Sequence, residues 1–362
     1  MQAQGAASRA QVAPAAARPA FCRASRTAAP QQAATRSRSS AAGATRRLVI
    51  SALVGGSAMP VVAAAAAPGG ASSNRLLIVG PGVLGSYLGK LWADENGAGS
   101  VVGQTNSTTN HAKLQALGIT PRTKDAAPAG GRFPYVLFAA PPSGSEDYVG
   151  EIKAALSLWD GTGAFVFTSS AGVYTVEDGS ACDESAPVAK MGDNERTDRL
   201  LAAEQAVLEA GGCVARLVGL YHAQRGAHTF FLRQGEVARW GGYTVNLIHY
   251  EDAAELCLAV LQGRGNGGSS YRGRTFLGCD GNPITFEDMM AATLASGAFQ
   301  GSYKFTGAEG PVKGKRMSNE ATRAQLQWQP KYPSYDSFMR QNKARDFYTE
   351  QQAAAVAGMP HA

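Results

Sequence analysis

Three closely spaced glycines could hold the pyrophosphate of a dinucleotide. The apolar residues 75–79 are followed by Gly80, Gly82 and Gly85, and residues 86–94 have the composition of a helix. In such a unit the first glycine makes a tight turn, the second lets the backbone approach the pyrophosphate, and the third lets the helix pack on the strand. The amino end of the helix offers free N–H groups to the phosphates. The spacing therefore predicts the opening of a nucleotide-binding βαβ unit, although a purely structural glycine turn reads the same way.

Several neighbouring residues are predicted to line the same cofactor site. Val83 and Leu84 lie between the glycines, and a second strand at residues 101–102 leads into the polar residues 104–109. We expect Thr105 and Asn106 to approach the ribose, because ribose hydroxyls are held at the end of the second strand of such a unit.

The composition of this loop favours NADP over NAD. No Asp or Glu occurs between Asn96 and Lys124. Proteins that prefer NAD usually carry an acid there, and a neutral loop tolerates a 2′-phosphate that a carboxylate would repel. Lys113 could assist, or it is a solvated helix lysine. The loop holds no arginine to clamp a phosphate, so this preference for NADP depends on the missing acid alone.

Two later strands are predicted to end at the same edge. Residues 133–142 are apolar and close in small residues, Ala139, Ala140 and Pro141. Residues 163–174 form a strand ending in Thr168, Ser169 and Ser170, and Tyr174 follows. Continuous apolar strands are typical of parallel sheets, whose ligands lie outside the carboxyl ends. We therefore expect a Rossmann-type, doubly wound α/β sheet, with Ala139 to Pro141, Thr168 and Ser169 beside the cofactor.

These motifs resemble the extended short-chain dehydrogenase/reductase superfamily of the NAD-dependent epimerase/dehydratase type. The family has a closely similar Ser-Ser-x-x-Val-Tyr at a strand end, which here is residues 169–174. Further matching segments are residues 183–187, 216–221, 246–252, 276–285, 315–319 and 332–335. The resemblance implies that Ser170 polarises a substrate and that Asp252 caps a late helix.

One departure from the family bears on catalysis. The resemblance implies a Tyr-x-x-x-Lys pair on the helix at residues 193–204, but the sequence contains no such pair. Alignment on Glu204 places Arg196 at the Tyr position and Leu200 at the Lys position, and a shift of the register by one gives Glu195 and Arg199 instead. The glycine spacing also differs from the GxxGxxG of extended members, and both departures indicate an atypical branch.

Three explanations of the missing pair stay open. Tyr174, Tyr221, His222 or His249 could transfer the proton instead, with His249 better suited by its ordinary pKa than a phenol without a lysine. Alternatively, the protein binds NADP(H) without turnover. Thirdly, Arg196 and Arg199 could bind an anionic substrate, or they are helix-surface arginines paired with nearby acids.

Residues 1–73 have the composition of an organelle targeting sequence. They contain eight arginines and no acid, among many Ala and Ser. Such a segment cannot bury a core and is typical of transit peptides, with a disordered basic arm as the alternative. Arg46 and Arg47 precede the apolar residues 48–67, which resemble a cleavable export signal. We expect a chloroplast protein, in the stroma or, if this second signal operates, in the thylakoid lumen.

The charge of the remaining chain does not favour nucleic acid as a partner. The chain has 34 basic and 28 acidic residues, so residues 74–362 keep 26 basic and 28 acidic ones, a net charge of −2. RNA binding is disfavoured on this ground, and no stable transmembrane segment is expected after residue 73. Cys182, Cys213, Cys257 and Cys279 lack metal-ligand spacing, so no metal site is predicted.

The sequence therefore predicts one Rossmann domain over residues 74–340, a substrate lobe contributed mainly by residues 220–340, and a tail at 341–362. Its predicted function is that of an NAD(P)(H)-binding oxidoreductase or epimerase-like enzyme acting on a small or anionic metabolite. The alternative is a catalytically inactive regulatory or assembly factor. The candidate catalytic residues are Ser170, Tyr174, His249 and Arg196.

Overall fold

The computed structural model describes residues 74–126 and 131–341. The predicted presequence, its apolar segment 48–67 and the predicted tail from residue 342 lie outside these ranges. Within them, no helix is both long and apolar enough to cross a membrane.

The centre of the molecule is a seven-stranded parallel sheet with the strand order β12-β7-β5-β4-β1-β2-β3. The chain starts in the middle and winds outwards in both directions, which is the doubly wound topology predicted from the sequence. The strands are β1 (Leu76–Val79), β2 (Val101–Thr105), β3 (Ile119–Thr123), β4 (Tyr135–Phe138), β5 (Phe165–Ser170), β7 (Cys213–Leu217) and β12 (Thr275–Gly278).

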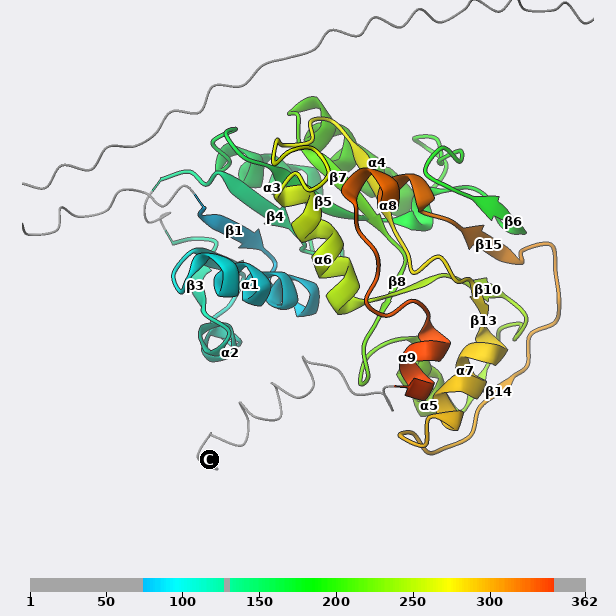
Figure 1. The fold of residues 1–362 in the computed structure, drawn as a ribbon. Coiled ribbons are helices and arrows are strands. Elements are labelled where there is room, and N and C mark those ends of the chain that lie inside the picture. Colours follow the sequence, from blue (N-terminus) through cyan, green and yellow to red (C-terminus); the bar gives the residue numbers. More distant parts are fainter. Residues whose placement is uncertain (1–73, 127–130, 342–362) are drawn as a thin grey trace, which may run out of the picture. The chain divides into compact units, whose positions relative to one another are not determined.

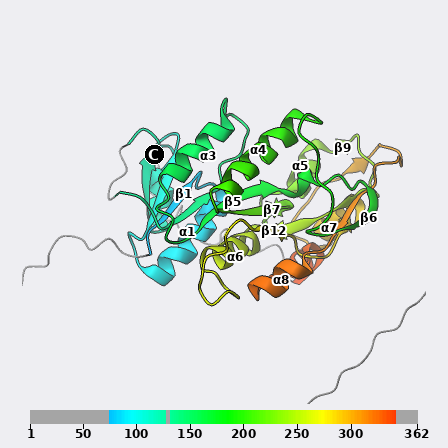
Figure 2. The same ribbon diagram turned by 90° about the horizontal axis from the view of Figure 1, so that it is seen from above.

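Helices cover both faces of this sheet (Figure 2). One face carries α1 (Val83–Asn96) and α6 (Tyr250–Leu261), and the other carries α3 (Tyr148–Ser157) and α4 (Glu195–Glu209). Alternate strand residues serve the two faces, so Leu76 and Ile78 belong to one apolar core and Leu77 to the other. This explains why the strands are apolar throughout. Two shorter elements, α2 (His111–Ala116) and the 3-10 turn Ala171–Val173, follow β2 and β5.

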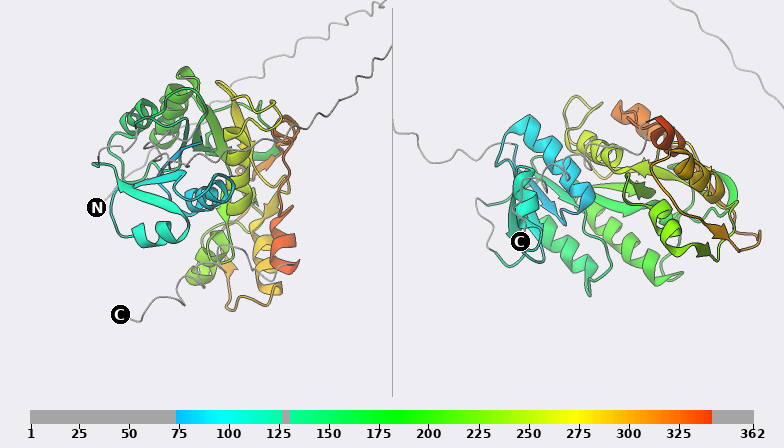
Figure 3. Two further views of the ribbon diagram at one scale, coloured as in Figure 1. Left: turned by 60° about the vertical axis from the view of Figure 1, so that its left-hand side comes forward. Right: turned by 90° about the horizontal axis from the view of Figure 1, so that it is seen from below.

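A second lobe lies beyond the carboxyl ends of the strands (Figure 1). Its strands are β6 (Asp178–Cys182), β8 (Gly219–Tyr221), β9 (Glu236–Val237), β10 (Thr244–Val245), β11 (Leu247–His249), β13 (Ile284–Thr285), β14 (Lys304–Phe305) and β15 (Gly314–Met317). Its helices are α5 (Ala227–Gln234), α7 (Phe286–Ala295) and α9 (Tyr335–Gln341), while α8 (Glu320–Leu326) packs on α6 and β12. Helices α5, α7 and α9 lie beside one another in this lobe (Figure 3). An aromatic and methionine core that includes Phe231, Met289 and Phe338 packs between them.

The element boundaries differ from the expected ones for local reasons. Helix α1 begins at Val83, directly after Gly82, rather than at Ser86. Strand β4 is shorter than residues 133–142, since prolines at both ends of that stretch cannot donate a backbone N–H to a sheet. The expected strand at 216–221 divides into β7 and β8, which join different sheets.

Candidate functional site

The glycine turn has the geometry of a phosphate-binding loop. Gly80 has a φ of +76°, in the left-handed region that favours glycine, and a Cβ there would lie 2.6 Å from the backbone of Ala140. Its N–H donates to the Gln104 oxygen at 3.0 Å. The turn is therefore fixed against the ends of both neighbouring strands, β2 and β4.

The next two glycines have different surroundings. A Cβ on Gly85 would lie 2.9 Å from Ile78 Cγ2, so helix α1 rests directly on β1. A Cβ on Gly82 would meet nothing closer than the Gly80 oxygen at 4.0 Å. Gly82 is also the N-cap of α1, and neither a capping side chain nor an acid in the first turn competes for the helix N–H groups. These amides and the positive end of the helix dipole can receive a phosphate.

The other predicted cofactor residues lie at the ends of neighbouring parallel strands. Thr105 ends β2 and Asn106 follows it, Ala139 to Pro141 follow β4, and Thr168 lies near the end of β5. Tyr148 donates its hydroxyl to the Ala140 oxygen at 2.8 Å, which fixes the loop after β4. Ser169 differs from these residues because it is buried and donates to Glu204 at 2.6 Å. Leu84 is also buried, on helix α1.

A cleft of about 770 Å³ opens between this edge of the sheet and α5. Val83 and Tyr250 line it from the starts of α1 and α6, and Val218 and Leu220 line it from the chain around β8. The remaining lining residues come from the loop before α5 and from α5 itself: His222, Gln224, Arg225, Gly226, Ala227, Thr229, Phe230 and Arg233. These lining residues include Arg225 and Arg233 but no Asp or Glu, so the lining carries positive charge.

Ser170 and Tyr174 lie at the end of β5. The half-buried Ser170 Oγ accepts from the Gly172 N–H at 3.1 Å and caps the 3-10 turn. Tyr174 is 2 % exposed and packs with Cys182 and Met317 in a separate apolar cluster. Burial raises the pKa of Tyr174, with the nearby Arg216 opposing the shift. The structure therefore places Ser170 at the carboxyl end of β5, and neither Ser170 nor Tyr174 is among the residues that line the cleft.

His249 is fully buried among aromatic rings. Its ring centroid lies 4.3 Å from that of Tyr332 and 4.9 Å from that of Phe338. Its Nδ1 accepts from the Glu251 N–H at 3.1 Å, which makes His249 the N-cap of α6. The resemblance had implied that Asp252 is this cap, and that expectation is wrong.

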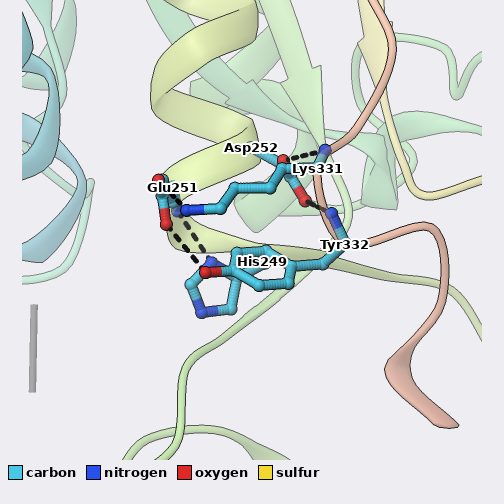
Figure 4. A network of polar contacts seen from close by, with 5 residues as sticks. All are labelled: His249, Glu251, Asp252, Lys331 and Tyr332. Atoms are coloured by element: carbon cyan, nitrogen blue, oxygen red, sulfur yellow. Dashed lines mark hydrogen bonds and ion pairs between the residues drawn. The ribbon is translucent and has the colours of Figure 1, made fainter. Parts of the chain in front are cut away.

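Asp252 instead fastens a distant segment of the chain (Figure 4). Its carboxylate accepts from the backbone N–H groups of Lys331 at 2.6 Å and Tyr332 at 3.1 Å. Glu251 accepts from the Lys331 Nζ at 2.7 Å and from the Tyr332 hydroxyl at 3.0 Å. Burial raises the pKa of Asp252 to about 7, against these hydrogen bonds. This network holds the segment before α9 on the start of α6.

His222 is the predicted imidazole that lines the cleft. It is 5 % exposed, and its Nδ1 accepts from the Gln224 N–H at 3.2 Å. In the neutral ring this bond assigns the proton to Nε2, because a nitrogen that accepts cannot also carry the hydrogen. Tyr221 is 1 % exposed, and burial raises its pKa well above the ordinary value of a phenol. His222 is therefore better placed for proton transfer than Tyr174, Tyr221 or His249.

Helix α4 presents no proton-transfer pair at the expected positions. Leu200 is buried in the core beneath the helix, whereas Arg196 is exposed on its first turn. Arg199 pairs with Glu195 at 2.6 Å, and both side chains are exposed. Neither arginine lines the cleft.

Sequence reasoning missed three arginines at this edge of the sheet. Arg225 and Arg233 line the cleft, and Arg122 lies on β3, paired in register with Gln104 of β2. Arg225 follows a strand that was predicted, so its place near the edge could have been inferred from the topology. Within residues 74–126 and 131–341, no cluster of His, Cys, Asp or Glu could hold a metal ion.

Comparison with known proteins identifies related folds. No family model and no curated protein sequence matches the chain. Among solved structures, a functionally unknown conserved protein from Silicibacter pomeroyi aligns with a TM-score of 0.61 and 21% identity, over 75% of this chain and 100% of that one. UDP-glucuronic acid 4-epimerase from Bacillus cereus, solved with NAD, aligns with a TM-score of 0.59 and 15% identity, over 77% of this chain and 99% of that one. UDP-glucose 4-epimerase from Thermotoga maritima, solved with UDP-glucose, aligns with a TM-score of 0.55 and 13% identity, over 77% of this chain and 99% of that one.

These neighbours share a fold, and the similarity covers almost their whole length. The resemblance predicted from the glycine turn and the Ser-Ser-x-x-Val-Tyr segment is thus confirmed at the level of the fold. The described chain has a Rossmann-type fold like that of these neighbours, which include UDP-sugar 4-epimerases.

Proposed function

We propose that the chain is a plastid NAD(P)(H)-binding protein of the atypical short-chain dehydrogenase/reductase type, and that it acts as an oxidoreductase or epimerase-like enzyme on a small anionic metabolite. The observation that carries this proposal is the open space at Gly82, at the uncapped start of α1. Neighbours of this fold that were solved with NAD support the same reading.

The charge of the cleft supports an anionic substrate. Arg225 precedes α5, while Thr229 and Arg233 are four residues apart and so share one face of that helix. Arg225 donates through Nε to the Tyr250 hydroxyl at 3.1 Å, which orients its guanidinium group. Neither arginine forms an ion pair with any described residue. Guanidinium groups bind carboxylate and phosphate well, so these two are suited to hold the charged end of a substrate.

In this proposal the cofactor lies at the glycine turn and supplies or accepts the hydride when bound. Val83 borders both that turn and the cleft, so a substrate in the cleft lies next to the cofactor site. His222 would exchange a proton with the substrate through Nε2. Ser170 would donate a hydrogen bond at the end of β5.

A specific observation favours the alternative of a regulatory or assembly factor without turnover. The family's Tyr and Lys positions hold the exposed Arg196 and the buried Leu200, and Tyr174 and His249 are enclosed. The presequence composition is the basis for placing either version in the plastid, in the stroma or, with a working export signal, in the thylakoid lumen.

Turnover distinguishes the two versions. Oxidation of NADPH and NADH should be followed with a panel of aldehydes and ketones, each tested in neutral form and as the corresponding phosphate or carboxylate. The enzyme proposal predicts turnover with anionic members. Binding of cofactor with no oxidation on any member would contradict the oxidoreductase version and leave the regulatory version or an epimerase, whose reaction causes no net oxidation of the cofactor.

Replacement of the cleft arginines tests the substrate side. Arg225→Gln and Arg233→Gln should each raise KM for anionic substrates by about tenfold or more, since a hydrogen bond to a charged group contributes roughly 1.5–3 kcal/mol. Arg239→Gln makes the same change at an exposed site outside the cleft and should leave KM unchanged. A rise in KM with Arg196→Gln instead would place the anion site on α4.

A further inference from the structure

The ends of β2 and β3 form a polar corner beside the glycine turn. Gln104 of β2 pairs in register with Arg122 of β3, and Thr105 pairs with Thr123. The backbone oxygen of Gln104 accepts a hydrogen bond from the Gly80 N–H, so the corner is connected directly to the phosphate-binding turn. Thr105 Oγ1 lies 3.2 Å from the Arg122 oxygen and 2.9 Å from His111 Nε2.

Two nitrogens of the Arg122 guanidinium in this corner lack a hydrogen-bond partner among the described residues. Its Nε and Nη1 atoms are buried, and neither makes a hydrogen bond within the described structure; the same holds for Gln104 Oε1. Burial lowers the pKa of Arg122, but a guanidinium starts so high that it stays charged at neutral pH. Neither β2, α2 nor β3 contains an acid, because Asp and Glu are absent between Asn96 and Lys124.

A partly buried cation with no anion beside it is costly, so this arrangement is suited to an anion that arrives with a ligand. The end of the second strand is where a Rossmann fold holds the adenosine ribose, and an arginine nearby can accommodate a 2′-phosphate. The following loop, with Thr105, Asn106 and Ser107, adds hydroxyl and amide groups and no opposing charge.

We propose that Arg122 binds the 2′-phosphate of NADP(H) and makes the protein selective for NADP(H) over NAD(H). This inference rests on the proposed function, since it assigns one end of the same cofactor site. The cation comes from β3, the strand that follows the polar loop of residues 104–109, which itself contains no arginine.

Dissociation constants for NADPH and NADH test the assignment. They should be measured by cofactor fluorescence on the purified full chain and on Arg122→Gln and Arg132→Gln variants. Arg132 is exposed and precedes β4, at the amino-terminal ends of the parallel strands and away from the carboxyl ends that carry the corner, so it controls for the change of charge. The wild type should prefer NADPH. Arg122→Gln should weaken NADPH by about tenfold or more and change NADH less than about twofold, and Arg132→Gln should change neither.

A second readout separates recognition from a structural role. Without cofactor, Arg122→Gln should melt at the same or a higher temperature than the wild type, because it removes a partly buried charge that no acid compensates. In competition with NADPH, 2′,5′-ADP should bind the wild type more tightly than 5′-ADP does, and Arg122→Gln should remove that difference.

Each remaining outcome would overturn the assignment. Equal weakening of NADPH and NADH would mean that Arg122 contacts the adenosine rather than the 2′-phosphate. Unchanged NADPH affinity, a wild-type preference for NADH, or a lower melting temperature of the cofactor-free variant would contradict the inference while leaving the proposed function intact. Failure of both cofactors to bind the wild type would overturn the proposed function, and this inference with it.

Discussion

At the scale of single residues, the glycine turn illustrates how a missing side chain provides a binding site. Position 80 requires a glycine because its φ is positive, and position 85 requires one because a Cβ there would crowd Ile78. Neither reason applies at position 82. Nothing in the described protein occupies the space beside Gly82. This open space points to a ligand rather than to packing. The same residue is therefore the sharpest place to test cofactor binding.

Substitution of Gly82 by Asp should abolish binding of NADPH and NADH, because the carboxylate would occupy and repel the place of the pyrophosphate. The fold should survive, since a Cβ at this position meets no atom within normal contact distance. Gly310→Asp is a matched control at another open glycine, remote from the turn, and should bind as the wild type does. Cofactor fluorescence and thermal melting check both variants, and undiminished binding by Gly82→Asp would contradict the placement of the cofactor.

Residues whose role depends on their own spacing could be predicted, and residues whose role depends on another element could not. Gly80, Gly82 and Gly85 were identified because three positions on one short segment define the turn. Arg122 was missed because its proximity to Gln104 follows from the register of β2 and β3. His249 was considered for catalysis, but its enclosure by Tyr332 and Phe338 depends on a segment some 80 residues later in the chain.

At the scale of elements, a buried ion pair joins α4 to the central sheet. Glu204 of α4 receives two N–H groups of Arg216, with the Nη2 to Oε2 distance at 2.7 Å, and also the hydroxyl of Ser169. The Arg216 guanidinium also lies over the Tyr174 ring, 4.9 Å from its centroid. This connection fixes the end of β5, which carries Ser170, relative to the helix.

Removal of one partner of this pair should be strongly destabilising. Glu204→Ala leaves Arg216 as an uncompensated buried charge and should lower the free energy of unfolding by about 3–5 kcal/mol. Glu195→Ala breaks the exposed pair with Arg199 on the same helix and should cost less than about 1 kcal/mol. Urea denaturation of both variants measures the difference, and equal losses would contradict the structural role of the buried pair.

The order and type of the main elements could be read from the sequence better than their ends. Apolar runs and helical spacing placed β1, β4, β5 and α3 correctly, because both layers of the fold bury those residues. The start of α6 was expected from the family resemblance of residues 246–252. The division of residues 216–221 into β7 and β8 was not predictable, since the two halves pair with distant strands. Similarly, β6 pairs with β15 of the second lobe, although β6 lies outside residues 220–340, which were expected to contribute most of that lobe.

At the scale of the whole molecule, the parallel topology explains why the candidate residues meet. Every strand of the central sheet ends at the same edge, so the glycine turn, the β2 corner with Arg122 and the end of β5 become neighbours. The second lobe then closes one side of the cleft with α5 and its arginines. A cofactor site along the edge and an anion site across the cleft follow from this single arrangement.

The most direct test of this account is titration of the purified protein with NADPH and NADH by cofactor fluorescence. The account predicts saturable binding of both cofactors at one site per chain, with tighter binding of NADPH. Absence of saturable binding by either cofactor would contradict it, and the glycine turn would then be a structural feature of the fold alone.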